Sequence, residues 1–175
     1  MNKIFPLIDR ISDSGLLART VSCWEEAVKR GGWSKQDLGS IPFTLLPAKY
    51  RPSIVVHTNG VAECAVSMGE VIKRTYGNNV DLNMDILISG AILHDVGKVL
   101  EYAVEKKGYV KSEYGKLIRH PISGASLAEE VGLPPEVVHI VWTHSHEGDK
   151  TPRTAESVLV HHADFANFEA LGGKA

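Results

Sequence analysis

The chain has 175 residues, a length that fits one domain large enough to bury a sizeable apolar core. Its net charge of −2 argues against binding of long nucleic acid by charge alone, because such domains are usually strongly basic. Two cysteines far apart in sequence argue against a disulfide scaffold, and no run approaches the roughly 20 apolar residues that span a bilayer. The first residues lack the apolar core of a signal peptide, so we expect a cytoplasmic protein without a membrane partner.

The first 50 residues are expected to form a helical extension that packs on the rest of the chain. Residues 12–34 combine polar N-cap candidates, apolar residues at helical spacing and a double-glycine stop, which predicts a helix. Residues 38–53 hold three prolines and are typical of a loop. This loop separates the extension, residues 1–50, from residues 51–175, which we expect to fold as a single globular unit.

The pattern after the loop predicts helices almost throughout. One long helix is expected over residues 53–77. Another begins at the N-cap candidate Asn83 and breaks at residues 94–97, where a polar His-Asp pair follows an apolar run. Residues 103–117 are polar and aperiodic, a pattern that leaves open a loop or a small β-hairpin.

Three more helices are expected toward the C-terminus, over residues 120–132, 134–143 and 154–172. Proline in the first turn favours the start of the first two, and glycine marks the end of the first and the third. Six or more helices with almost no strand signal predict an all-α fold.

All eight histidines lie from His57 onward. A metal site needs imidazole and carboxylate groups that converge from several elements. A His-Asp dipeptide alone is common by chance, but here it belongs to a series whose members lie on different predicted helices or helix ends. The series is His57, His94, Asp95, His120, His144 and Asp164.

Four segments resemble motifs of the HD-domain superfamily of metal-dependent phosphohydrolases. The segment HDVGK is similar to the central motif of that superfamily, and HTNGVAECA is similar to its leading histidine helix. HPISGASLAEE resembles a later segment, and HHADFANFEA resembles the closing aspartate helix. The resemblance covers roughly residues 53–170 and implies an HD-domain helical bundle.

The resemblance also implies one or two divalent metal ions. The first would be held by His57, His94, Asp95 and Asp164. The second would be held by His120 and His144, with Asp95 bridging the two ions. Imidazole with carboxylate ligation suits Fe, Mn, Co or Ni better than Mg. His146 competes with His144 as a ligand, and it is otherwise a candidate proton donor to the leaving group.

Cationic side chains near the motifs are the candidates for binding a substrate phosphate. Lys98 follows the His-Asp pair by one turn and is the main candidate. Arg119, Lys150 and Arg153 flank His120 and the loop after His144 and are further candidates. The expected catalytic residues are Asp95, Lys98 and His146.

The function that we expect is hydrolysis of a phosphomonoester or phosphodiester bond in a nucleotide or another small phosphorylated metabolite. Two alternatives stay open: a mixed-valent diiron oxygenase of the HD type, and a non-catalytic HD module that binds a nucleotide. Two roles for the first 50 residues also stay open, a cover over the active site or the contact of a homodimer, because nothing in that segment decides between them.

Overall fold

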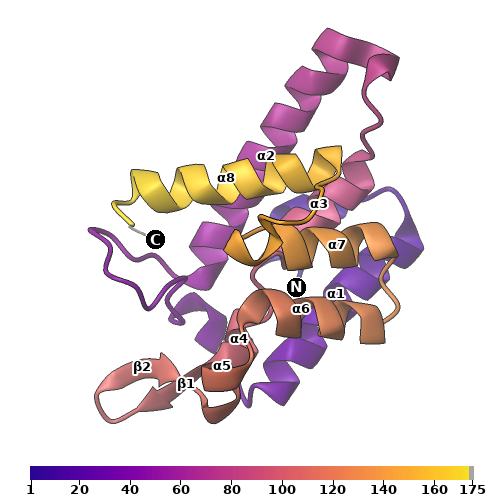
Figure 1. Cartoon of the computed structure of the whole chain (residues 1–175). Coiled ribbons are helices and arrows are strands. Elements are labelled where there is room, and N and C mark those ends of the chain that lie inside the picture. The colour runs from indigo at the N-terminus through magenta and orange to yellow at the C-terminus, as the bar shows by residue number, and fades with distance from the viewer. Residues whose placement is uncertain (174–175) are drawn as a thin grey trace.

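The computed structural model describes residues 1–173, which are largely helical and contain one small sheet, a two-stranded hairpin (Figure 1). The expected all-α class is confirmed. Residues 174–175, the end of the expected 51–175 unit, lie outside the described residues. In chain order the α-helices are α1 (Ser14–Arg30), α2 (Ile54–Tyr76), α3 (Met84–Leu93), α4 (Lys98–Glu101), α5 (Glu113–Leu117), α6 (His120–Glu130), α7 (Pro135–Thr143) and α8 (Ala155–Ala170).

Side-chain caps fix the starts of the longer helices. The carboxylate of Asp13 accepts hydrogen bonds from the first turn of α1, and the Ser53 hydroxyl accepts one from the first turn of α2. Asn83 caps α3 as the sequence predicts, and Thr154 caps α8. Each cap satisfies amide groups that have no partner inside the helix. The caps therefore set the register at which α2, α3 and α8 carry their histidines and aspartates.

The hairpin consists of β1 (Tyr102–Glu105) and β2 (Gly108–Lys111), paired antiparallel with Tyr102 opposite Lys111. It projects from the helical body in Figure 1. The hairpin alternative for residues 103–117 is thus confirmed for its first half, whereas residues 113–117 form the short helix α5. The Ser112 hydroxyl caps α5 by accepting from the Gly115 amide. Five residues are too few for a helical repeat to show in the sequence.

Helix α3 lies at the centre of the bundle and contacts α1, α2, α7 and α8. Every residue from Ile86 to Leu93 is buried. A helix that is apolar on all sides is stable only when other elements enclose it. The enclosure places the end of α3, and the His94–Gly97 turn that follows, inside the molecule, where both His94 and Asp95 have no exposed surface.

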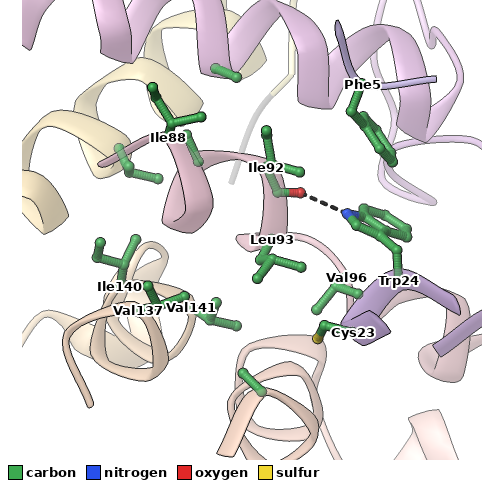
Figure 2. Close-up of a cluster of buried hydrophobic side chains, with 14 of the residues drawn as sticks. Phe5, Cys23, Trp24, Ile88, Ile92, Leu93, Val96, Val137, Ile140 and Val141 are labelled. Atoms are coloured by element: carbon green, nitrogen blue, oxygen red, sulfur yellow. Dashed lines mark hydrogen bonds between the residues drawn. The ribbon is translucent and has the colours of Figure 1, made fainter. Parts of the chain in front are cut away.

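The N-terminal residues share one continuous core with the rest of the chain. Phe5 and Trp24 are fully buried, and their rings stack at a centroid distance of 4.8 Å (Figure 2). The core that contains them also contains α3 and α7 residues such as Ile92 and Val137. The division of the chain at residue 50 stays a prediction. No helix within residues 1–173 is both long and apolar enough to cross a membrane.

A single hydrogen bond joins α1 to the end of α3. The Trp24 indole Nε1 donates to the Ile92 carbonyl at 3.0 Å (Figure 2). That carbonyl lacks its usual helical partner, because the Val96 amide donates to Leu93 instead. Trp24 therefore satisfies a buried acceptor next to the His94–Gly97 turn.

We expect Trp24→Phe to lower the free energy of unfolding by about 2–4 kcal/mol, because it leaves the Ile92 carbonyl unpaired and a cavity beside it. Urea denaturation measures the change. Trp142→Phe is the matched control, since Trp142 is 41% exposed on α7 and its loss should stay within about 0.5 kcal/mol. Equal effects of the two substitutions would contradict the anchoring role of Trp24.

Candidate metal centre

Six side chains from five places in the sequence converge inside the bundle. His57 comes from α2 and Asp164 from α8, while His94 and Asp95 follow the end of α3. His120 begins α6 and His144 follows the end of α7. They form two groups, each with its candidate ligand atoms within 4.8 Å of one another. The groups are His57, His94 and Asp164, and Asp95, His120 and His144.

The Asp95 carboxylate belongs to the second group and also faces the imidazoles of the first. Its Oδ2 is 3.5 Å from His57 Nε2 and 3.4 Å from His94 Nε2. Its Oδ1 is 3.4 Å from His120 Nε2 and 3.7 Å from His144 Nε2. Each oxygen of one carboxylate thus faces a different pair of imidazoles, which is the arrangement that a bridging ligand needs.

Backbone carbonyls orient two of these imidazole rings. His94 Nδ1 donates to the Ala91 carbonyl at 2.7 Å, and His144 Nδ1 donates to the Val141 carbonyl at 2.7 Å. A carbonyl only accepts, so the proton of a neutral ring lies on Nδ1 and the Nε2 lone pair points toward Asp95. Metal-bound histidines commonly hold their second nitrogen in this way.

Glu101 orients the third ring, a role that no sequence motif indicates. Its Oε2 accepts from the His120 backbone amide at 2.7 Å and lies 2.8 Å from His120 Nδ1. Burial alone would raise the pKa of Glu101, but the bonds to His120 and the nearby Arg119 guanidinium outweigh it and lower the pKa to about 2. The signal available in the sequence was a lone glutamate one turn after Lys98, which is too common to single out.

A glycine makes the approach of α6 to Asp95 possible. A Cβ atom at Gly97 would lie 2.1 Å from the His120 carbonyl oxygen and 2.8 Å from the Gly124 amide nitrogen. Both contacts are with backbone, so a side chain at Gly97 would push α6, and with it His120, away from the turn. The close packing of α6 therefore explains why the HDVGK segment has glycine at position 97.

The residues fit a bound cation. His94 Nε2, Asp95 Oδ1 and His144 Nε2 are buried and have no hydrogen-bond partner among the described residues. Lone pairs of imidazole and carboxylate that face one another at such distances repel unless a positive charge lies between them. Ligands about 2.0–2.2 Å from one ion lie about 3.0–3.4 Å apart, close to the separations around Asp95.

Metal binding requires neutral imidazole and ionised carboxylate, and the pKa shifts of His57, His120 and the two aspartates are in the directions that favour these states. Burial lowers the pKa of His57 and lowers the pKa of His120 to about 4. Burial would raise the pKa of Asp95, yet the Lys98 ammonium and the His94 ring hold it well below its usual range. The pKa of Asp164 is also lowered, because the hydrogen bond from His57 and the charge of His94 outweigh its burial.

Lys98 connects the metal centre to an adjoining cavity. Its ammonium is 2.6 Å from Asp95 Oδ2 and 5.7 Å from the centre of the Phe43 ring. Lys98, Arg119 and His146 all line this cavity, beside His120 and Asp164. His146 lies at the exposed rim, where its Nδ1 pairs with Asp149 at 3.1 Å. His144, by contrast, is buried in the centre itself.

Two of the predicted phosphate-binding residues are placed elsewhere. Lys150 is exposed and does not line the cavity. The Arg153 guanidinium donates to the Thr143 and Ser145 carbonyls and to Asp149. These hydrogen bonds stabilise the loop after α7. Neither cation lines the cavity beside Asp95, and the hydrogen bonds of Arg153 to backbone carbonyls are contacts that the sequence pattern does not reveal.

The protein is thus a helical domain whose interior gathers four imidazoles and two carboxylates that could hold metal ions. The model of the HD domain family matches residues 54–165 of this chain. The chain therefore belongs to the HD domain family, as its motifs predict.

Named relatives share this domain. A dihydroneopterin 2′,3′-cyclic phosphate phosphodiesterase of Methanocaldococcus jannaschii is 31% identical over 68% of the chain and 47% of its own length. A 3′-5′ exoribonuclease YhaM of a Geobacillus species is 34% identical over 61% of the chain and 36% of its own length. A ribonuclease Y of Petrotoga mobilis is 31% identical over 86% of the chain and 25% of its own length. The chain thus matches less than half of each relative. No solved structure gives a significant match.

We expect Glu101→Gln to weaken cation binding by the group of Asp95, His120 and His144 by about tenfold or more, because Gln keeps the shape but not the charge that orients His120. Metal retained after dialysis against a chelator measures the effect. Glu113→Gln is the control, because the Glu113 side chain is 90% exposed on α5. Unchanged metal retention in Glu101→Gln would show that His120 needs no such orientation.

Proposed function

We propose that this protein is a metal-dependent phosphohydrolase that cleaves a phosphoester bond in a small phosphorylated metabolite, with nucleotides among the candidates. The observation that carries the proposal is the Asp95 carboxylate, whose two oxygens face separate groups of imidazoles at 3.4–3.7 Å. One carboxylate shared between two sites would hold two cations close together, as in hydrolytic sites that use a pair of metal ions.

Two divalent ions bound here would supply an activated water and would offset the negative charge that develops on the phosphoryl oxygens. His57, His94 and Asp164 would hold one ion, His120 and His144 the other, and Asp95 both. Iron, manganese, cobalt or nickel suits this donor set. The near-complete burial of His94, Asp95 and His144 keeps bulk water from the ligand atoms and strengthens every charge interaction among them.

The remaining roles fall to residues that line the cavity. Lys98 presents an ammonium beside Asp95, where it would bind a phosphoryl oxygen and orient the ester. Arg119 is a second cation at the same cavity, held by Glu101 at 3.3 Å and Glu147 at 3.1 Å. His146 remains the candidate proton donor to the leaving group, because its ring lies at the cavity rim and Asp149 fixes one of its nitrogens.

The names of the relatives support this class of reaction. The names of the three relatives describe enzymes that cleave phosphoester bonds, one in a cyclic phosphate and two in RNA. For the present chain the net charge of −2 favours a compact substrate over long nucleic acid. We therefore place RNA chains behind small phosphate esters as candidates.

The test is metal analysis of the purified protein together with a panel of phosphomonoesters and phosphodiesters. We expect up to two ions per chain and release of phosphate or of the leaving alcohol. In the same assay, Asp95→Ala should lose both bound metal and turnover, because a methyl group cannot replace a carboxylate shared by two cations. Asp81→Ala is the control, since Asp81 is exposed and lies outside the centre.

Retained turnover in Asp95→Ala would overturn the proposed mechanism. An iron-loaded sample that takes up O₂ with a phosphonate or polyol, and releases nothing from esters, would favour an oxygenase. Full metal loading with no turnover of any ester would favour a binding module.

The identity of the ligand from the end of α7 has its own test. We expect His144→Ala to lower the metal content toward one ion per chain, because the His144 ring is buried beside Asp95. His146→Ala should keep the full content, since its ring is exposed and pairs with Asp149. Mass spectrometry of the metal content compares the two variants. The opposite pattern would assign the ligand role to His146.

A further inference from the structure

We propose that the substrate of this site carries a flat aromatic or heteroaromatic group close to its phosphate, and that an aromatic wall beside the metal centre binds this group. We define the aromatic wall as Leu45, Leu46, Phe165 and Phe168, which line the same cavity as Lys98 and Arg119. This inference rests on the proposed function for the position of the phosphate, because it takes the phosphate to lie at the metal centre.

The lining of the cavity combines two chemical characters. It includes the cations Lys98, Lys111 and Arg119. It also includes the aromatic wall, in which Leu46 is 49% exposed and both Phe165 and Phe168 are half-buried. Apolar side chains left open to a cavity that also holds cations suit a ligand with one anionic end and one apolar end.

The rings of the wall are fixed in place by neighbouring rings. Phe168 contacts the buried Phe43 ring edge to face at 6.1 Å between centroids. Phe165 meets His146 at 4.9 Å and 90°, and His161 at 4.5 Å. Rings held in this way are ready to stack on a flat group without losing further side-chain freedom.

The spacing along α8 limits how far the ring of the substrate lies from the phosphate. Asp164 faces the metal centre, and Phe165 and Phe168 follow it by one and four residues. Four residues of helix rise about 6 Å. A nucleobase on a mononucleotide, or an aryl group esterified directly to phosphate, fits that reach. The hydroxyl groups of a plain sugar phosphate would lose water against Leu45, Leu46 and Phe168 without gaining partners.

Part of the wall lies outside the segment that the family model matches. Leu45, Leu46 and Phe168 fall before residue 54 or after residue 165. The loop that carries Leu45 and Leu46 is held over α2 by Phe43, whose ring lies 4.4 Å from the His57 ring. Preference for a ring-bearing substrate is therefore built on this chain's own N-terminal segment and the end of α8.

The test uses a matched pair of phosphonates that cannot be hydrolysed as esters, phenylphosphonate and methylphosphonate, with the metal-loaded full chain. Calorimetry should show that the wild-type protein binds phenylphosphonate more tightly than methylphosphonate. Phe168→Leu should weaken phenylphosphonate binding by about threefold to tenfold, since an aromatic contact is lost while apolar volume is kept. It should leave methylphosphonate binding unchanged.

Leu117→Ser is the control variant, because Leu117 is 83% exposed on α5 and does not line the cavity. It should bind both phosphonates as the wild-type protein does. Equal affinity for the two phosphonates, or an equal loss of affinity for both in Phe168→Leu, would overturn the aromatic wall.

Hydrolysis assays on phenyl phosphate and glycerol phosphate separate the two proposals. Equal turnover of both esters would overturn the aromatic wall and leave the phosphohydrolase standing. A phenyl preference in binding without turnover of any monoester or diester in the panel would support the wall and overturn the phosphohydrolase.

Discussion

The structure depends on one buried carboxylate. Asp95 has no exposed surface, and an ionised carboxylate in such a place is strongly unfavourable unless opposite charges or donors surround it. Four imidazole nitrogens and the Lys98 ammonium lie within 3.7 Å of its two oxygens. Helices α2, α6 and α7 must therefore end or pass at fixed points around the turn after α3. The caps that set their register and the glycine at position 97 serve the same requirement.

A second layer connects this carboxylate to the cavity. The Oε2 atom of Glu101 holds the His120 ring, while its Oε1 lies 3.3 Å from Arg119 and 3.4 Å from Lys111. One side chain thus touches both a candidate metal ligand and two cations of the cavity. An anion that binds Arg119 and Lys111 would compete with Glu101 for these two cations. The electrostatic potential at His120, which Glu101 contacts, would change as a result. Substrate binding and metal binding are for this reason expected to influence one another.

Much of this arrangement could be predicted from sequence, because the signals were local. An apolar run followed at once by His94 and Asp95 indicated an enclosed helix that ends in polar groups. Glu101 and the Leu45–Leu46 loop gave no such signal, since their positions depend on contacts between residues far apart in sequence, such as Phe43 with His57. The prediction that Lys150 and Arg153 bind the phosphate depends only on their closeness to His144 in the sequence. Arg153 instead satisfies carbonyls of its own loop, a backbone requirement that charge patterns do not show.

The separation between the metal centre and the aromatic wall has a physical reason. Ligands for a cation must be rigid and dry, and here the candidate ligands come from helices and helix ends whose positions the core determines. Contacts that select the organic part of a substrate must stay open to solvent, so they lie on the Leu45–Leu46 loop and the end of α8. Changes to these partly exposed side chains should cost less stability than changes at Asp95, around which the whole bundle is arranged. Under the proposed function, the same buried centre would serve different esters, and the wall would select among them.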